Sequence, residues 1–564
     1  MKRMFFGAVV FFAMISVVSG CTWLTGDDET PNPNLYKMQW GGCPDYIDNS
    51  EDCALVEVPL DYGDENGESI EIFVYRRHGT ASKIKGQIWF LQGGPGASGA
   101  VFAPYFDQSL LVRYPQYDYY SLDHRGVGNS TKLDCPSVDW IPDDVSGCVN
   151  ELEQAWGDGV KSFTVTNAAM DLGKIIEAAR EPGQPVMVYA ASYGTYWAQR
   201  YLQLFPDQAD AVVLDSISNP GISYFDDTDL DYISVGKSFM EVCGKDAVCK
   251  SRLSYLGATP NDAVAALFNK LDSGELCSEF TDDYSRRRLR RLFGAMLMND
   301  AMRRLIPPLI VRIDRCETGD LEALANLQEA RDSMVIEARE YLQEKDLFSY
   351  ALYWEIVFSE QWLGRSLLEI EQITDGAYFS IDGVRSSAEM YATGLWPVYS
   401  NDGYFDEYAN TKIPMLMLAG GLDPQTPLHS AKPAAQAYNH PHQTFVTLPY
   451  SPHIGIINSP TYKSIVHEGA PCGEQMVFSF YADPDAPVNQ SCMSELYPLE
   501  FSGSSALNRT ISKKYFGTDD MWDGDPQKSA TATLSVDNPM VQWINAAELS
   551  QIHDPHFLLY AVGE

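Results

Sequence analysis

The chain has 564 residues, of which 45% are hydrophobic, and its 77 acidic residues against 40 basic ones give a formal net charge of −37. This length exceeds a single compact core and predicts a core with an inserted region. So negative a chain repels phosphates, which excludes nucleic acid as a partner, and the charge fits a solvated, exported protein.

The first 20 residues have the pattern of a targeting segment. A basic start precedes the apolar run Phe5–Val18, and small residues lead up to Cys21. The run is short for a membrane-spanning helix, and acidic residues follow it. We therefore predict a signal peptide at residues 1–20 and a flexible tether at 21–35. The alternative is a soluble secreted protein that is cleaved nearby.

The cysteine count predicts disulfides. Of 11 cysteines, setting Cys21 aside leaves ten, an even number in an oxidising compartment. Pairing by proximity in the sequence, with the last two left for each other, would give Cys43–Cys53, Cys135–Cys148, Cys243–Cys249, Cys472–Cys492 and Cys277–Cys316, although one sequence does not derive connectivity. Because there is no C-x-x-C and no histidine pair on one helical face, we predict no metal site.

Alternating segments and apolar runs predict the strands. Leu55–Tyr62 and Ser69–Arg76 alternate and predict antiparallel edge strands. Mostly apolar runs predict buried parallel strands at residues 86–91, 117–122, 185–190 and 211–214. Because the helical pattern Thr166–Glu181 separates such runs, we predict an α/β fold with a doubly wound, mostly parallel sheet.

The pattern changes to helices after the first part of this core. We predict helices at Asn261–Leu271, Arg286–Ile306, Asp320–Gln343 and Leu347–Trp362. The acidic cluster at Asp226–Asp231 lacks the glycine and terminal glutamate of a calcium loop and predicts a solvated loop. Strands resume at Pro414–Ala419 and His442–Leu448. The predicted division is a first core segment at 36–221, a helical cap at 222–398, a second core segment at 399–500, and an extension at 501–564 with no functional interpretation.

The segment Pro185–Pro206 places a serine at a strand-to-helix turn. Its apolar run leads into Ala190-Ala191-Ser192-Tyr193-Gly194 and then into a helical pattern. Small neighbours allow a tight turn that lifts the hydroxyl above the sheet, and the helix directs its first amides at the same spot. The usual pattern is G-x-S-x-G, with Ala190 here in the first position. Ser192 is the candidate nucleophile; the competing interpretation is an ordinary buried junction.

Two later loops supply a candidate acid and base. Asp423 follows the strand predicted at Pro414–Ala419, and among nine histidines His453 is the one at loop distance after the last good strand. The order Ser–Asp–His is that of an alpha/beta-hydrolase triad. The competing acid is Asp215, for which we predict a structural role in the loop beneath the site.

The glycine-rich loop after residues 86–91 predicts an oxyanion hole. Backbone N–H groups must point at the developing negative charge, and bare glycine backbone can approach a substrate carbonyl closely. We assign the N–H groups of Tyr193 and Gly94, with Gly93 as the alternative to Gly94.

Five sequence blocks, LQGGPGASG, DHRGVGNS, AASYGT, GGLDPQTP and SPHIG, resemble the signature blocks of the S33 peptidase family. That family comprises proline iminopeptidase and tripeptidyl aminopeptidase-like enzymes with a TAP-like C-terminal region, and the resemblance spans Leu91 to about Cys492. It implies an alpha/beta-hydrolase fold and a serine exopeptidase that acts on free peptide N-termini without a cofactor. Gln92 and Ala190 depart from the family, which often has histidine and glycine there, and this bears on the substrate more than on the chemistry.

The S33 resemblance also concerns the substrate's amino terminus, and a separate resemblance concerns the membrane. Family members carry a glutamate late in the cap, which implies Glu360 in YWEIVFSEQW, with Glu355 as the alternative; a surface carboxylate is the competing interpretation. V-S-G-C resembles a bacterial lipobox, which implies lipidation of Cys21, and the Thr22 that follows favours the outer membrane. We therefore expect an exported protein that is lipid-anchored in the cell envelope.

Two other functions remain open at this point. An esterase or amidase would use the same triad, because acyl chemistry does not specify the leaving group. A non-catalytic binding lipoprotein could keep the fold without the reaction.

Overall fold

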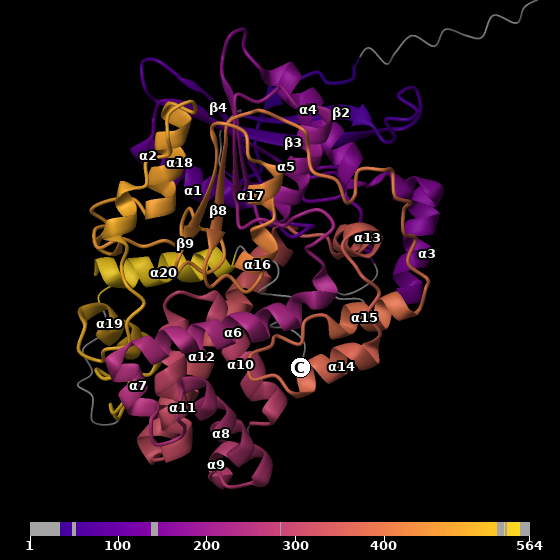
Figure 1. The fold of residues 1–564 in the computed structure, drawn as a ribbon. Coiled ribbons are helices and arrows are strands. Elements are labelled where there is room, and N and C mark those ends of the chain that lie inside the picture. Colours follow the sequence, from indigo (N-terminus) through magenta and orange to yellow (C-terminus); the bar gives the residue numbers. More distant parts are fainter. Residues whose placement is uncertain are drawn as a thin grey trace, which may run out of the picture.

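The computed structural model describes residues 34–47, 52–136, 145–282, 284–526, 535 and 538–552. The predicted signal peptide, Cys21 and all but the end of the tether lie outside these residues. The described residues form a nine-stranded sheet in the order β1-β2-β3-β5-β4-β6-β7-β8-β9. Helices cover both faces of the sheet, and a helical region lies beyond one end of its strands (Figure 1).

The sheet begins antiparallel and continues parallel. The antiparallel strands are β1 (Trp40–Gly41), β2 (Cys53–Pro59) and β3 (Ser69–Arg77), and β3 also runs antiparallel to β5 (Tyr117–Leu122). The others are parallel: β4 (Gly86–Leu91), β6 (Val186–Ala191), β7 (Ala211–Asp215), β8 (Met415–Gly420) and β9 (Gln443–Leu448). All residues of β4 to β8 are buried. Their continuous apolar runs follow from burial on both faces, and the predicted mostly parallel sheet is confirmed.

Alternate side chains of the central strands enter two separate cores. Trp89 and Val188 pack on the face covered by α3 (Val145–Trp156), α4 (Val165–Ala179) and α5 (Tyr193–Leu204). Phe90 and Tyr189 pack on the opposite face with α18 (Cys472–Ala482). Short helices complete the connections: α1 (Ala103–Tyr105), α2 (Leu111–Arg113), α16 (Leu428–Ala431) and α17 (Ala434–Ala437).

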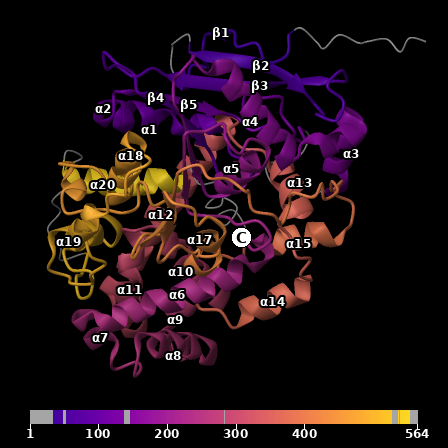
Figure 2. The same ribbon diagram turned by 45° about the horizontal axis from the view of Figure 1, so that its top comes forward.

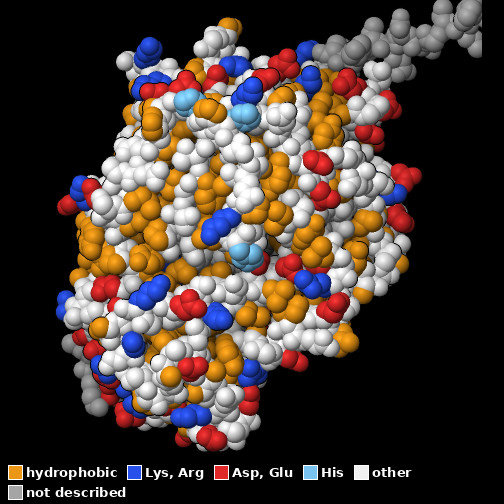
Figure 3. Space-filling model, in the orientation of Figure 1, with side chains coloured by type: hydrophobic (Ala, Val, Ile, Leu, Met, Phe, Trp, Pro, Cys, Tyr) orange, Lys and Arg blue, Asp and Glu red, His pale blue; other side chains and the backbone are white. Residues whose placement is uncertain are grey.

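Helices make up the segment between β7 and β8. They are α6 (Thr228–Lys245), α7 (Ala247–Leu253), α8 (Pro260–Ser273), α9 (Ser278–Thr281), α10 (Arg286–Met298), α11 (Ile306–Arg315), α12 (Thr318–Glu344), α13 (Tyr350–Glu360), α14 (Leu367–Asp375) and α15 (Arg385–Ala392). Figure 2 shows most of them gathered on the side of the molecule away from β1–β3. On the face in Figure 3, acidic and basic side chains are intermingled over this helical region.

Two local predictions in this region are wrong. Residues Arg286–Ile306 do not form one helix: α10 ends at Met298, and the Asn299 side chain accepts the backbone N–H groups of Ala301 and Met302, which starts a separate 3-10 turn. A polar side chain that bonds local backbone competes with helix continuation.

The acidic cluster is not a solvated loop either, because α6 begins inside it. Asp226 and Asp229 are each only 2% exposed. Asp226 accepts the N–H groups of Leu363 and Arg365, and Asp229 accepts the hydroxyl of Ser380. These carboxylates hold the later part of the helical region against α6.

The C-terminal part adds two helices, α19 (Ala506–Tyr515) and α20 (Pro539–Ile552). In Figures 1 and 2, α20 lies between α18 and α12. The sequence has a strand-like pattern at Thr531–Val536, which lies almost wholly outside the described residues. The structure forms all five disulfides expected from sequence proximity. Throughout the described part of the chain, no helix combines the length and apolarity needed to cross a membrane.

Candidate active site

Ser192 occupies a strained turn between β6 and α5. Its backbone has φ 56° and ψ −129°, a conformation that non-glycine residues rarely adopt. The Ser192 N–H donates to the carbonyl of Asp215 at 3.0 Å, and the Ser192 carbonyl accepts from Thr195 N–H at 2.8 Å. The turn is thus bonded to β7 on one side and to its own helix on the other. Backbone strain that the surroundings hold in place is typical of functional sites.

The loop after β4 lies directly against this turn. A Cβ atom on Gly93 would stand 2.8 Å from Ser192 Cβ, and one on Gly194 would stand 2.4 Å from the Leu91 carbonyl oxygen. Gly94 has φ 116°, which also requires glycine. Because β4 and β6 are neighbours at the point where the strand order reverses, the loop and Ser192 meet in the crevice where such sheets bind ligands. The assignment of Tyr193 and Gly94, or Gly93, to an oxyanion hole remains a prediction.

His453 and Asp423 are hydrogen-bonded to each other. His453 Nδ1 lies 3.0 and 2.9 Å from the two Asp423 carboxylate oxygens. Because a carboxylate only accepts, Nδ1 carries the proton and Nε2 is left as the acceptor. The Asp423 carboxylate also accepts the N–H groups of Gln425 and Thr426 and the Thr426 hydroxyl. Burial alone would raise the pKa of Asp423, but the neighbouring His453 and these hydrogen bonds outweigh it and hold the pKa below its usual value.

Asp215, the competing acid, holds the loop that carries His453. Its two carboxylate oxygens accept the N–H groups of Gly455 and Ile456, both at 2.7 Å, and it also accepts the Tyr189 hydroxyl. Burial raises the pKa of Asp215 to about 6. The predicted structural role of Asp215 beneath the site is confirmed by these bonds.

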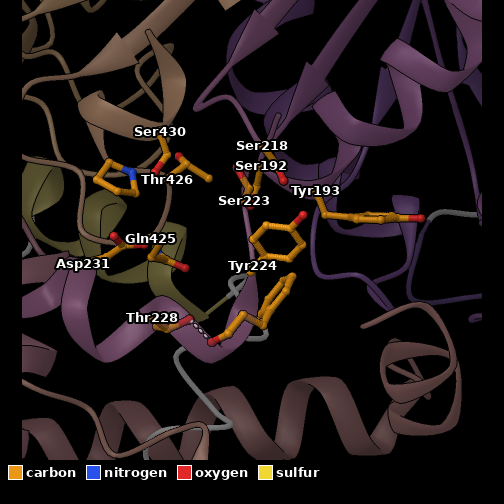
Figure 4. A pocket seen from close by; sticks show the side chains of 12 residues that line it. Ser192, Tyr193, Ser218, Ser223, Tyr224, Thr228, Asp231, Gln425, Thr426 and Ser430 are labelled. Atoms are coloured by element: carbon orange, nitrogen blue, oxygen red, sulfur yellow. Dashed lines mark hydrogen bonds between the residues drawn. The ribbon is translucent and has the colours of Figure 1, made fainter. Parts of the chain in front are cut away.

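Two cavities meet at Ser192. The larger, of about 290 Å³, is lined by His453, by the loop Gln92–Gly94 and by mainly apolar side chains. The smaller, which we call the polar cavity, is lined by aromatic side chains together with hydroxyl and amide groups. Figure 4 shows the side chains that carry these hydroxyl and amide groups: Ser218, Ser223, Thr228, Gln425, Thr426 and Ser430. The Tyr193 side chain points away from the others in this view.

Asp231 brings a carboxylate to the polar cavity, and sequence analysis missed this residue. It lies on the lining with Ser192, and its Oδ1 is 3.2 Å from Nε2 of the mostly exposed His429. Burial raises the pKa of Asp231 to about 6. The sequence offered one signal, its position in the acidic cluster, which we interpreted as solvated.

The two glutamates predicted to bind the substrate's amino terminus lie elsewhere. Both Glu360 oxygens already accept hydrogen bonds, one from Tyr399 and the other from Tyr196 and Arg200. Its side chain is fully buried in an ion pair with Arg200 at 2.7 Å. Neither Glu360 nor Glu355 lines either cavity at Ser192. The geometry therefore disfavours both glutamates as the ammonium site.

Glu355 is a second buried carboxylate. It is 0% exposed and accepts a hydrogen bond from Trp396 Nε1 at 2.9 Å. Burial raises its pKa well above the usual value.

The DHRGVGNS block supports the site from beneath and does not enter it. The fully buried Arg125 forms a two-pronged ion pair with Asp171, each bond 2.8 Å long, and donates to the carbonyls of Pro59, Leu60 and Ser162. It thereby joins the end of β2, the 3-10 turn before α4, and the middle of α4 to its own loop. The block's distinctive arginine is a packing and hydrogen-bonding element.

Within the described residues, no group of three or more His, Cys, Asp or Glu side chains is arranged to hold a metal ion.

Comparison with known proteins places these features in a family context. Residues 88–246 match the family described as alpha/beta hydrolase fold, and residues 384–492 match the family described as TAP-like protein. Tripeptidyl aminopeptidase of Streptomyces lividans is 31% identical over 192 residues, covering 30% of this chain and 35% of the relative. Serine protease Hip1 of Mycobacterium tuberculosis is 28% identical over 247 residues, covering 39% and 46%. Carboxylesterase B of the same organism is 31% identical over 125 residues, covering 20% and 24%. Each match spans less than half of the relative's length.

Proposed function

We propose that this chain is a serine exopeptidase that removes amino acids or short peptides from free peptide N-termini. Its matches to the alpha/beta hydrolase fold family over residues 88–246 and to the TAP-like family over residues 384–492 support this proposal. The observation that carries the proposal is one constellation: Ser192 on a strained turn, in one cavity with a His453 that is bonded to Asp423. The similarity to a tripeptidyl aminopeptidase and a serine protease supports peptide as the substrate.

In this proposal Ser192 Oγ attacks the substrate carbonyl while His453 Nε2 takes the hydroxyl proton. Asp423 stabilises the imidazolium and fixes its tautomer, and the Tyr193 and Gly94 N–H groups stabilise the oxyanion. His453 then gives the proton to the leaving amine, which departs and leaves an acyl-enzyme. A water molecule, deprotonated by His453, hydrolyses the ester and frees Ser192.

An exopeptidase of this kind must bind the substrate's terminal ammonium group. Two carboxylates share a cavity lining with Ser192: Asp231 in the smaller cavity and Glu474 in the larger one. Glu474 is already paired with Arg113, and the hydroxyls and amides near Asp231 suit a peptide backbone. We assign the ammonium site to Asp231. Glu360 instead stabilises the packing of α13 against α5 through Arg200.

A substrate panel tests the proposed function against an esterase with the same triad. Aminoacyl and short peptidyl anilides with a free amino group should be hydrolysed, and acetylation of that group should abolish most of the rate. The carboxylesterase relative makes short-chain nitrophenyl esters the necessary comparison. A preference for these esters, or indifference to acetylation, would show that the exopeptidase assignment is wrong.

The variant Asp231→Asn should raise KM for free-amine substrates by about tenfold or more, because a hydrogen bond between two charged groups contributes about 1.5–3 kcal/mol. With a pKa of about 6, Asp231 loses its charge as the pH falls through 6, so KM of the native protein should rise there and KM of the variant should not. The charged groups that face Asp231 are His429, Asp227 and Asp423.

Asp227→Asn is the matched control for this prediction, because Asp227 pairs with Arg365 and is absent from the cavity lining. Its KM should stay near that of the native protein. An unchanged KM in Asp231→Asn, or an equal rise of KM in both variants, would show that Asp231 does not bind the substrate's ammonium group.

We further propose that the protein is exported and anchored in the cell envelope, with the outer membrane as its destination, by a lipid on Cys21. The signal-peptide pattern and the V-S-G-C block support this placement. Partition of the full-length protein into the detergent phase of a Triton X-114 separation, lost in Cys21→Ala, is the expected result. Equal partition of both proteins would contradict the anchor.

A further inference from the structure

The larger cavity at Ser192 has an apolar wall to which the C-terminal part of the chain contributes one residue. Phe102, Ile456 and Ile457 line the cavity together with Trp543 of α20. Ser192 and His453 are on the same lining, so whatever fills the cavity lies beside the reacting atoms. The volume of about 290 Å³ is close to the lower end of the about 300–1,000 Å³ that is usual for ligand pockets.

Trp543 is held firmly in this position. It is 8% exposed and belongs to the same buried core as its neighbour Ile544, which is 0% exposed. Helix α20 contacts α12 of the helical region, α19, and the 3-10 turn Ser464–Val466 of the core. Residue 543 lies outside both segments matched by known families, 88–246 and 384–492. Trp543 is therefore the part of the wall that lies beyond the family matches.

Two charged residues on the cavity lining, Arg113 and Glu474, form an ion pair with each other. Arg113 donates from Nε and Nη2 to the two oxygens of Glu474, and the Tyr105 hydroxyl donates to the same carboxylate at 3.0 Å. The Glu474 side chain is fully buried, while Arg113 retains partial exposure. Because Arg113 and Glu474 neutralise each other, neither charge is left to bind a charged ligand. The cavity therefore favours an uncharged, apolar occupant over a charged one.

We propose that this cavity receives a bulky apolar side chain of the acyl part of the substrate, and that Trp543 sets the length and bulk it accepts. The proposal depends on the proposed function only in that Ser192 is the nucleophile. It does not require the substrate to be a peptide. Trp543 acts by excluding volume and takes no part in proton transfer.

The chain length that the cavity accepts can be measured from the rate at which alkyl fluorophosphonates of different length phosphonylate Ser192. The full-length protein would be treated with fluorophosphonates whose alkyl group is ethyl, butyl, octyl or dodecyl. Since each buried methylene contributes about 0.8 kcal/mol, the rate should rise about fourfold per methylene until the cavity is full, and then fall. In Trp543→Ala the optimum should move to longer chains, with the dodecyl rate raised by about tenfold or more over the native protein.

Ile544→Ala is the matched control, because it removes a buried side chain from the same helix without touching the cavity lining. Its optimum should coincide with that of the native protein. Trp543→Phe, a smaller change that is easier to fold, should shift the optimum in the same direction as Trp543→Ala but by less.

Each other outcome has a definite meaning. A native rate that does not depend on chain length overturns the assignment of the cavity to the acyl group. Equal shifts in Trp543→Ala and Ile544→Ala overturn the role of Trp543, because they indicate loosening of α20. Absence of labelling by every probe overturns the nucleophile, and with it both this proposal and the proposed function. Chain-length selection as expected, together with failure of the free-amine substrate panel, overturns the exopeptidase alone.

Discussion

Replacing Ser192 with alanine is expected to lower kcat/KM by about 10⁴-fold or more, and adding His453→Ala to that variant is expected to cost almost nothing further. The reason is that the serine and the base act as one unit: without the hydroxyl there is no proton for His453 to accept. His453→Ala alone should approach the same loss, because Ser192 then lacks a base. Steady-state rates on a free-amine anilide, with fluorophosphonate labelling of Ser192, measure both effects.

His442→Ala provides the control for this double-variant cycle. His442 is exposed and precedes β9, at the opposite end of the strand from His453. Its replacement should leave the rate and the labelling unchanged. Losses from Ser192→Ala and His453→Ala that multiply in the double variant would show that the two residues do not act on the same step.

Arg125→Met is expected to lower the free energy of unfolding by about 3–5 kcal/mol. The substitution leaves the Asp171 carboxylate buried without its partner and removes the donor from three carbonyl groups. With the guanidinium gone, burial would favour the protonated carboxylic acid at residue 171, so the loss should be smaller at low pH. Urea unfolding followed by fluorescence and circular dichroism measures the change.

A surface pair provides the comparison for this prediction. The Arg180–Asp210 pair at 3.1 Å has side chains 34% and 50% exposed, and Arg180→Met should cost within about 1 kcal/mol. Replacing both Arg125 and Asp171 with apolar residues should recover part of the loss, because no unpaired charge is left buried. An Arg125→Met protein as stable as the native one would show that the DHRGVGNS block does not act through this ion pair.

The parts of the structure that were predictable from sequence are those with a local or one-dimensional signal. Burial on both faces makes the parallel strands continuous apolar runs, so the sequence pattern predicts the exact bounds of β4 and the bounds of β6 and β8 to within one residue. Each loop that follows such a strand is then a candidate site, and these loops contain Ser192, Asp423 and His453. Proximity in the sequence also predicted four of the disulfides, and the fifth joins the two cysteines that were left.

The substrate side of the site could not be predicted in this way, because its contacts join distant segments. Glu360 was favoured as the ammonium site by its position in the predicted cap. In the structure, Arg200 of α5 and Tyr399 of the loop after α15 donate hydrogen bonds to its two carboxylate oxygens. Asp231 reaches the polar cavity only because Asp226 and Asp229 bond later residues and fix the start of α6. Trp543 reaches the apolar cavity from a segment some 90 residues after His453 in the sequence. Periodicity carries no information on such pairings.

The bonds between Asp215 and the loop of His453 also bear on how the sheet opens. In the described part of the chain, strand β9 is an edge strand that pairs with β8 alone, and edge strands are among the first elements to open transiently. The histidine loop follows β9 in the chain, yet its amides at Gly455 and Ile456 are held by the carboxylate of interior strand β7. Fraying of β9 therefore need not displace the base. In hydrogen exchange, the amides of Gly455 and Ile456 should exchange as slowly as those at the centre of the sheet. The amides of β9, which precedes them in the chain, should exchange at the faster rate of an edge strand.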